Sequence, residues 1–545
     1  MNEVWESEAS TDELSVRAEK RKALARTLAL LILTSVSAFL PVLGLKSGAF
    51  GLVCAGLCVF AGLVAFPDLL AGIRGFSAGG SDASLRMTAW GAVLAHSLRT
   101  AFVAGAECVT YTWLVFLCYT VTFLIRFLSE REMEKNIRLI RDHPVSVAET
   151  APSDLKRRRV RNLCLTRPVD KKPEIAFASR AGDPAKNRNK GFVPVCIGLS
   201  LVAPIGALIF GGAEAFWACL VSSFCLCAGL SSEIGCRLPY LFAQHRLRED
   251  GCVLPGWNAV ARLYRCDTLV TQDTELFPAG TVSVTDLRFR RSFNGSLSME
   301  YLAALLRAAD SPAAHALLRV IAFDPEFLPE VRSFRLVPDG GISGEINGHA
   351  VLAGNRNLMR AHGIPPLPQS REALIRSATE ALMYFAVDGE LAAMVLFQYT
   401  GEDALAAWLR SLGTEVSVVV DTADSNLTEN TVRKAYRSDG LRVLIPDADE
   451  RKFLRKIRRR LEDRPCRPVL VMRRGSGGLF AGISHAKTVY ERTVTAITLR
   501  QICTIAGITL TAVASFLVPG ALSPWWVFLY HLIWVVPVLT QTVDK

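Results

Sequence analysis

The chain has 545 residues, of which 50% are hydrophobic and 21% charged, and its mean hydropathy is +0.28. This length suffices for several domains, and the mixture favours apolar blocks alternating with soluble ones over one uniform core. The net charge of +11 fits Lys and Arg on the flanks of membrane helices. Because no basic face interleaved with aromatic residues occurs, we expect no nucleic-acid partner.

In chain order, the first strong signal is a series of apolar runs of about 20 residues, the length that crosses a bilayer. Seven runs predict membrane helices: Ala23–Leu45, Ser47–Phe66, Tyr111–Leu128, Val193–Gly212, Glu214–Leu230, Ile502–Val518 and Trp525–Val543. An eighth, weaker run, Met87–Gly105, carries His96 and Arg99. We expect Arg99 near a helix end or in a protein-lined groove, since a charge facing lipid is costly.

About eight crossings place both termini on one side of the bilayer. The basic residues before the first helix mark that side as cytoplasmic, and we expect a plasma-membrane location. The boundaries follow from the runs: a tail (1–22), helices 1–4 (23–128), a cytoplasmic insert (129–192), helices 5–6 (193–240), a soluble block (241–498) and helices 7–8 (499–545).

The soluble block alternates strand-like runs with helical patterns. The strand-like runs are Thr268–Thr271, Val416–Val420 and Val469–Met472, and the helical patterns are Met299–Ala322, Asp403–Leu412 and Asp449–Leu461. This alternation predicts an α/β fold around a parallel sheet.

One segment of the block carries a family resemblance. Residues 338–359 read PDGGISGEINGHAVLAGNRNLM and match, without a gap, a pattern of P-type ATPases, PGKGVxGxVDGxxVxVGNxxLM. The chain therefore resembles these pumps, most closely the heavy-metal branch. The resemblance implies a HAD-like phosphorylation domain, here 241–280 and 401–498, with an inserted α+β nucleotide-binding domain at 281–400.

The resemblance also implies ATP-contacting residues. His315 falls on the family's adenine-contacting His, and Gly341, Gly354 and Asn355 fall in the glycine pattern. Glycine lets a backbone approach a ligand closely. The alternative for His315 is that it is an ordinary surface residue of a helix. Asp339 argues against nucleotide binding, because it replaces the family's first glycine and its carboxylate would repel phosphate.

The phosphorylation motif departs from the family. Where pumps read DTVVFDKTGTLTxG, residues 267–280 read DTLVTQDTELFPAG, so that Gln272 replaces the phosphorylated Asp. An amide cannot form the acyl-phosphate intermediate. The neighbouring Asp273 is an alternative nucleophile, but a one-residue slip along a strand would point it to the opposite face.

The magnesium signature departs independently. The family's PVAMVGDGxND aligns with residues 468–478, PVLVMRRGSGG, which places Arg474 and Gly478 where pumps hold Mg²⁺ with carboxylates. A guanidinium offers no acceptor, so we expect the Mg²⁺ site to be lost. Lys452 matches the family's phosphate-neutralising lysine, although a charge run on a helix is also typical of a solvated face.

The remaining pump signatures are incomplete. The insert contains no Thr-Gly-Glu triplet, the dephosphorylating motif of the family's actuator domain, and is about half the expected length. Cys225 and Cys227 stand where heavy-metal pumps carry Cys-Pro-Cys. They form either a soft-metal site or two apolar core residues.

Together these departures predict a catalytically inactive pseudo-pump with a regulatory, sensing or scaffold role and residual nucleotide binding. Its expected partners are the bilayer, ATP and a transported or sensed cation; the sequence names no protein partner. One alternative is an active heavy-metal ATPase with non-standard chemistry. Another is a purely structural membrane protein without a nucleotide site.

Overall fold

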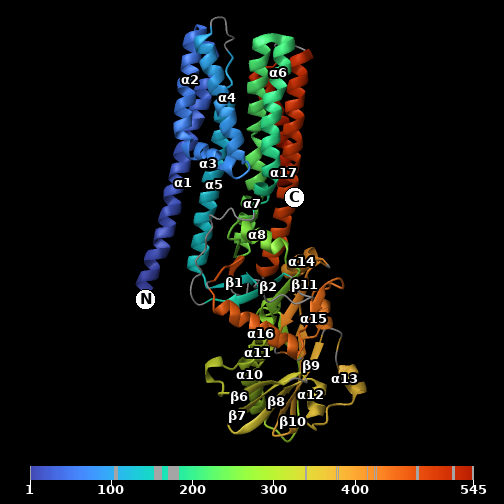
Figure 1. Ribbon diagram of the computed structural model, residues 1–545. Coiled ribbons are helices and arrows are strands. Elements are labelled where there is room, and N and C mark those ends of the chain that lie inside the picture. The colour runs from blue at the N-terminus through green and yellow to red at the C-terminus, as the bar shows by residue number, and fades with distance from the viewer. Residues whose placement is uncertain are drawn as a thin grey trace. The chain divides into compact units, whose positions relative to one another are not determined.

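The computed structural model describes residues 2–103, 109–151, 162–169, 183–337, 340–375, 377, 380–413, 415–422, 424, 426–464, 466–473, 478–517 and 522–542. The chain divides into two compact units (Figure 1). A helical unit comprises Met1–Leu139, Phe177–Arg248 and Lys487–Lys545, and a globular unit comprises Ile140–Ala176 and Glu249–Ala486.

The helical unit contains long, mostly apolar helices. These are α1 (Asn2–Phe39), α2 (Ser47–Val64), α3 (Phe66–Ser77), α4 (Asp82–Phe102), α5 (Thr112–Asp142), α6 (Pro184–Cys227), α7 (Ser231–Glu249), α17 (Gly478–Leu517) and α18 (Pro524–Thr542). Each expected membrane run overlaps at least one of these helices, although Ala23–Leu45 continues past the end of α1 and Ser47–Phe66 extends from α2 into the first residue of α3. Among the described residues, five helices (α1, α2, α5, α6 and α17) are long and apolar enough to cross a membrane.

The expected count of eight crossings is therefore not confirmed by length and composition. Helix α6 contains two of the expected runs, and Gly212 interrupts it with non-helical angles (φ 76°, ψ −170°) that a residue with a side chain rarely adopts. The apolar part of α18 is shorter, at Pro524–Thr540. Arg99 lies in the last turn of α4 and pairs with Glu214.

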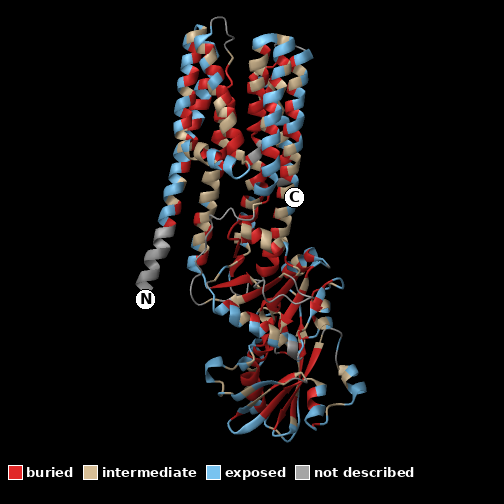
Figure 2. Cartoon of the chain, viewed as in Figure 1, coloured by how far each residue is buried: buried red, intermediate tan, exposed pale blue. Residues whose placement is uncertain are grey.

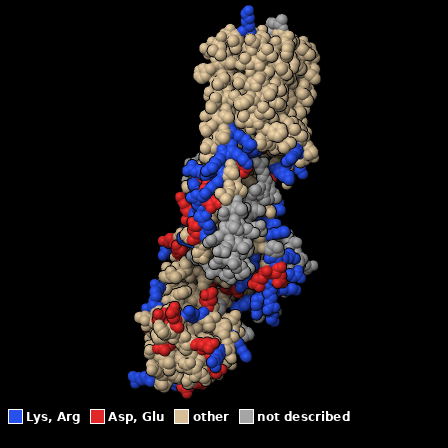
Figure 3. Space-filling view, turned by 90° about the vertical axis from the view of Figure 1, so that its left-hand side faces the viewer, with Lys and Arg blue, Asp and Glu red and all other residues tan. Residues whose placement is uncertain are grey.

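The outer sides of these helices carry exposed residues (Figure 2), many of them large and apolar, such as Ile32, Phe60 and Ile209. On the face drawn in Figure 3, a broad band of the unit shows no charged side chain, and basic side chains gather at one edge of that band. Such a surface matches lipid hydrocarbon, where helices satisfy their backbone groups internally.

The globular unit contains two sheets (Figure 1). The seven-stranded sheet has the order β12-β11-β4-β2-β1-β13-β3. Its strands are β1 (Val145–Thr150), β2 (Leu163–Pro168), β3 (Cys252–Val253), β4 (Thr268–Gln272), β11 (Ser417–Asp421), β12 (Arg442–Leu444) and β13 (Leu470–Arg473). Strands β12, β11, β4 and β2 pair in parallel, whereas β1 runs antiparallel to both of its neighbours. The expected parallel sheet is thus a mixed one.

Helices α8 (Trp257–Tyr264), α9 (Asp273–Leu276), α14 (Asp403–Leu412), α15 (Glu429–Ala435) and α16 (Ala448–Glu462) belong to the same part of the chain as this sheet. Leu454, Ile457 and Leu461, spaced three and four residues apart on α16, pack with Val270 of β4 and Val419 of β11. That spacing places one apolar stripe of the helix against the sheet.

The six-stranded sheet is antiparallel and has the order β5-β10-β9-β8-β7-β6. Its strands are β5 (Val282–Phe289), β6 (Arg332–Val337), β7 (Gly341–Ile346), β8 (His349–Gly354), β9 (Glu380–Val387) and β10 (Glu390–Tyr399). Helices α10 (Gly295–Ala308), α11 (Pro312–Ile321), α12 (Arg356–Ala361) and α13 (Gln369–Ile375) accompany it. The expected single helix Met299–Ala322 is divided because Asp310 has φ 52°, after which Ser311 caps α11 and Pro312 begins it.

Candidate functional site

The carboxyl ends of β4 and β11 lie side by side in the seven-stranded sheet. Gln272 ends β4 and pairs in register with Asp421, the last residue of β11. In open α/β sheets, ligands bind outside the carboxyl ends of parallel strands. This edge of the sheet is therefore the expected position of a ligand-binding or catalytic site.

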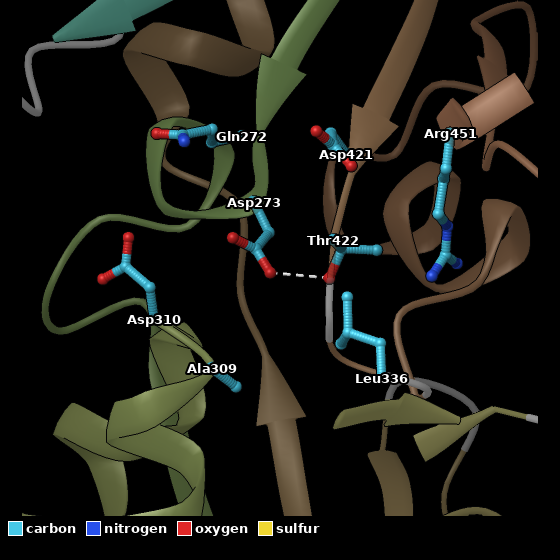
Figure 4. Close-up of a pocket in the computed structure, with 8 residues that line it drawn as sticks. All are labelled: Gln272, Asp273, Ala309, Asp310, Leu336, Asp421, Thr422 and Arg451. Atoms are coloured by element: carbon cyan, nitrogen blue, oxygen red, sulfur yellow. Dashed lines mark hydrogen bonds between the residues drawn. The ribbon is translucent and has the colours of Figure 1, made fainter. Parts of the chain in front are cut away.

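A cavity of about 160 Å³ opens at this edge (Figure 4). The residues that line it come from both sheets and their helices: Gln272, Asp273, Ala309, Asp310, Leu336, Asp421, Thr422 and Arg451. Three of these eight side chains are carboxylates and one is a guanidinium.

Asp273, rather than Gln272, is turned towards Thr422 (Figure 4). Strand β4 ends at Gln272, and Asp273 begins the helical turn α9, so that its side chain enters the cavity without the strand slip that the sequence argument required. Its carboxylate accepts hydrogen bonds from the Thr422 hydroxyl at 2.6 Å and the Thr274 amide at 2.8 Å. Burial raises the pKa of Asp273 to about 7.

The loop after β11 is closed by its own hydrogen bonds. The Asp424 amide donates to the Thr422 hydroxyl at 2.9 Å, and the Asp424 carboxylate accepts from the Asn426 amide at 2.9 Å and from the Tyr399 hydroxyl. Burial raises the pKa of the Asp424 carboxyl. The Thr422 hydroxyl and the Asp424 carboxylate thus have partners inside the protein.

Sequence reasoning did not select six of the cavity residues, namely Ala309, Asp310, Leu336, Asp421, Thr422 and Arg451. The signal for two of them was the polar segment directly after β11. Arg451 lines the cavity, whereas its neighbour Lys452, the residue suggested by the resemblance, is exposed and does not line it. Adjacent helix residues point about 100° apart, so only one of the two can face the cavity.

The predicted magnesium residues lie at a different strand. Arg474 is outside the described residues, and Gly478 begins α17, a few residues after β13. In the sheet, β2 and β1 stand between β4 and β13. Three strand spacings correspond to about 14 Å, whereas two ligands of one Mg²⁺ lie only about 4 Å apart.

The residues present therefore do not fit a magnesium ion shared by β4 and β13. Gln272 offers a neutral amide and Gly478 no side chain. Among the described residues, no group of three or more His, Cys, Asp or Glu side chains could hold a metal ion.

The predicted nucleotide residues lie on the six-stranded sheet and its helices. Gly341 and Gly354 are direct cross-strand partners, and Asn355 caps α12 by accepting from the amides of Asn357 and Leu358. A Cβ at Gly354 would lie 2.5 Å from Leu358 Cδ2, and one at Gly341 only 2.2 Å from the same atom. Packing inside the sheet thus accounts for both glycines without a ligand.

His315 lies on α11 with its side chain exposed. None of these four residues lines the described cavity.

The two cysteines of the predicted soft-metal site point into different surroundings. Cys225 packs in the cluster that contains Val221 and Phe224. Cys227 packs with Cys196 and lies 3.3 Å from the Ser200 hydroxyl. Two residues along a helix are about 200° apart, so the thiols do not converge on one ion.

Comparison with known proteins shows similarity to heavy-metal P-type ATPases. No protein-family model matches it. Copper-exporting P-type ATPases of Staphylococcus aureus strains MW2 and Newman are each 26% identical over 276 residues, which cover 47% of this chain and 32% of the relative. The match thus spans about a third of the length of these curated relatives.

A solved zinc-transporting PIB-type ATPase in the E2.Pi state superposes with a TM-score of 0.50 and 14% sequence identity, covering 96% of this chain and 99% of that chain. The chain is therefore an integral membrane protein with a PIB-type ATPase fold and with relatives in the heavy-metal branch of P-type ATPases.

Proposed function

We propose that this protein is a pseudo-pump: it keeps the fold of a heavy-metal P-type ATPase but forms no aspartyl phosphate, and acts in the membrane as a regulator, sensor or scaffold. The observation that carries the proposal is the strand order β4-β2-β1-β13. Transferring a phosphoryl group depends on positioned metal ions and charges. Here the strand that would carry the nucleophile and the strand before the magnesium signature are separated by two others.

The composition of the cavity supports the same proposal. Asp310 and Asp421 line it beside Asp273 and one basic side chain, Arg451, and Asp421 also pairs with Arg458 at 2.8 Å. Carboxylates that line a cavity repel a polyphosphate unless a metal neutralises them. Gln272 adds no charge.

An orientation with both termini cytoplasmic, in the plasma membrane, belongs to the proposal too, on the basis of the basic flank of α1. So does residual nucleotide binding at the six-stranded sheet. The resemblance supports nucleotide binding. The close packing around Gly354 and Gly341 also explains why these positions are glycine without a bound nucleotide.

The experiment is ATP hydrolysis and ⁶⁵Zn²⁺ or Cu⁺ uptake by the full chain in sealed proteoliposomes. We expect no metal-stimulated hydrolysis and no ATP-dependent uptake. The control is an intact heavy-metal pump reconstituted in the same lipids, which must show both. Metal-stimulated turnover by this chain would refute the pseudo-pump.

A second candidate is an active pump that uses Asp273 as its nucleophile. The observation in its favour is the position of the Asp273 carboxylate, inside the cavity and at the end of β4. If this candidate is correct, turnover must be present in the natural chain and absent in Asp273→Asn, whereas Asp310→Asn, a change on another element of the cavity wall, retains it.

A further inference from the structure

A chain of buried charges joins four helices of the helical unit. The Arg86 guanidinium on α4 makes two parallel contacts with Asp68 of α3, Nε to Oδ2 at 2.8 Å and Nη2 to Oδ1 at 3.0 Å. Its Nη1 lies 3.1 Å from Glu233 Oε1 of α7. Arg86 thus stands between two carboxylates, and the side chains of Arg86 and Asp68 are only 3% and 0% exposed.

Two outer arginines complete the chain of charges. Arg126 of α5 lies 2.9 Å from Asp68 Oδ1, and Arg237 of α7 lies 2.7 Å from Glu233 Oε2. The order is therefore Arg126, Asp68, Arg86, Glu233, Arg237, with alternating sign. The outer arginines are partly exposed, at 23% and 19%.

Close packing of α3 on α4 brings Asp68 to Arg86. Gly72 lies against α4 so tightly that a Cβ would approach the Ala83 carbonyl oxygen to 2.7 Å, and the Ser84 hydroxyl donates to the Gly72 carbonyl at 2.9 Å. The two helices therefore hold the ion pair on a rigid base.

The same pairing recurs throughout this unit. All of the buried carboxylates in its described part, namely Glu13, Asp68, Glu134 and Glu233, have a basic partner. Arg500 of α17, 2% exposed, likewise pairs with Asp82 at 2.6 Å. The described helices thus neutralise their own buried acids.

We propose that Arg86 is a resident cation: its guanidinium takes the place that a divalent cation would occupy between Asp68 and Glu233, and so it blocks cation binding and pins α3, α4 and α7 together. This inference rests on the proposed loss of transport. Carboxylate oxygens are the ligands that hard divalent cations prefer, and Asp68 and Glu233 contact the same guanidinium. Removing the bridging guanidinium would leave each buried carboxylate with only its outer, partly exposed arginine, which costs stability because a buried charge loses its closest compensation.

The test uses the full chain purified in detergent, with Mn²⁺ as the probe followed by electron paramagnetic resonance and by thermal unfolding. The natural chain is expected to bind no Mn²⁺ that depends on Asp68. Arg86→Met is expected to lower the apparent Tm by several degrees and to gain one Mn²⁺ site, and bound Mn²⁺ restores most of the lost Tm. Adding Asp68→Asn to that variant abolishes the site.

Two further variants keep the test decisive. Arg126→Met is the matched control, because it removes an arginine from the same carboxylate but leaves Arg86 in place, and it is expected to gain no Mn²⁺ site. If Arg86→Met aggregates, the triple variant Asp68→Asn, Arg86→Met, Glu233→Gln is expected to recover a monodisperse fold without binding Mn²⁺.

Three results would overturn the inference: Asp68-dependent Mn²⁺ binding by the natural chain, an unchanged Tm in Arg86→Met, or a triple variant as unstable as the single one. A phosphoenzyme or active transport would instead count against the pseudo-pump proposal, so the two failures are distinguishable.

Discussion

At the end of β4, the amide of Gln272 is followed directly by the carboxylate of Asp273. The resemblance implies that Gln272 stands where pumps carry their nucleophile, and Asp273 turns into the cavity to accept a hydrogen bond from Thr422. The sequence indicated both residues but placed Asp273 on the wrong face. Its side-chain direction depends on where the strand ends, and periodicity locates element ends poorly.

The raised pKa of Asp273 predicts a pH dependence of stability. Its folded-state pKa of about 7 lies above the ordinary value of 3.8 for an aspartic acid, so between these two pH values the folded chain binds a proton that the unfolded chain does not. Stability therefore falls as pH rises through this window, by up to about 1.4 kcal/mol per pH unit. We expect Asp273→Asn to raise the apparent Tm relative to the natural chain at pH 8 and to lose this advantage at pH 5.

The control for this measurement is Asp286→Asn, a change at a partly exposed carboxylate of β5 that pairs with Arg288. It should show no growing advantage at high pH. An Asp273→Asn variant with the same Tm difference at both pH values would contradict the shifted pKa.

Gly354 gives a second prediction for a single residue. A Cβ there would lie 2.5 Å from Leu358 Cδ2 and 2.6 Å from the Gly340 carbonyl oxygen. Because one of these atoms is backbone, the neighbours cannot all move aside, and we expect Gly354→Ala to destabilise the six-stranded sheet by about 1–3 kcal/mol. Hydrogen exchange of the β7 and β8 amides measures this; protection equal to that of the natural chain would argue that the sheet accommodates a side chain.

At the scale of elements, the sequence located three strands of the globular unit, β4, β11 and β13, and four of its helices, α10, α11, α14 and α16, but none of the other strands that the structure describes there. Val416–Val420 became β11 (Ser417–Asp421), shifted by one residue, and Asp403–Leu412 became α14 with the same bounds. The insert was different: β1 and β2 were not expected there. The pattern of alternating apolar and polar residues in these two strands is short. Glu149 of β1 pairs with Arg167 of β2 and accepts a hydrogen bond from the Arg467 amide, and Arg467 lies 318 positions away along the chain.

The order of the sheet is itself testable. Ser146 of β1 is the direct antiparallel partner of Met472 of β13, and such partners have Cα atoms about 4.5–5.5 Å apart, within disulfide range. We expect Ser146→Cys with Met472→Cys to form a disulfide under mild oxidation, identified by peptide mass spectrometry.

The matched pair is Thr271→Cys with Leu470→Cys, which joins β4 to β13 directly. We expect no link there, since about 14 Å separates those strands. Linkage of the second pair and not of the first would mean that β13 neighbours β4, and would restore the geometry of a working site.

At the scale of the whole molecule, long apolar runs were the most readable signal, and the helical unit contains a helix at each of them. The number of crossings is not confirmed, because α6 is a single long helix interrupted at Gly212 where the sequence predicted two, and because neither α4 nor α18 is both long and apolar enough to count as a span. The buried charges of α3, α4 and α7 were not visible from the sequence, since only the packed helices bring Asp68, Arg86 and Glu233 together.

The arrangement of the whole sheet also predicts the ATPase activity of a variant in which only the carboxylate at position 272 is restored. Gln272→Asp restores a carboxylate at the end of β4, but Gly478 and the intervening β1 and β2 still leave no second set of magnesium ligands. We expect this variant to show no ATPase activity above that of the natural chain, measured as phosphate release with and without Zn²⁺. Metal-stimulated release in the single variant would mean that β13 is not needed.

The most direct measurement of the central claim is covalent capture of phosphate on the protein. The full chain is incubated with [γ-³²P]ATP and Mg²⁺, precipitated with acid and treated with hydroxylamine, alongside an intact heavy-metal pump. We expect label on the pump and none on this chain. An acid-stable, hydroxylamine-sensitive label that is lost in Asp273→Asn would contradict the account and establish a working phosphoenzyme.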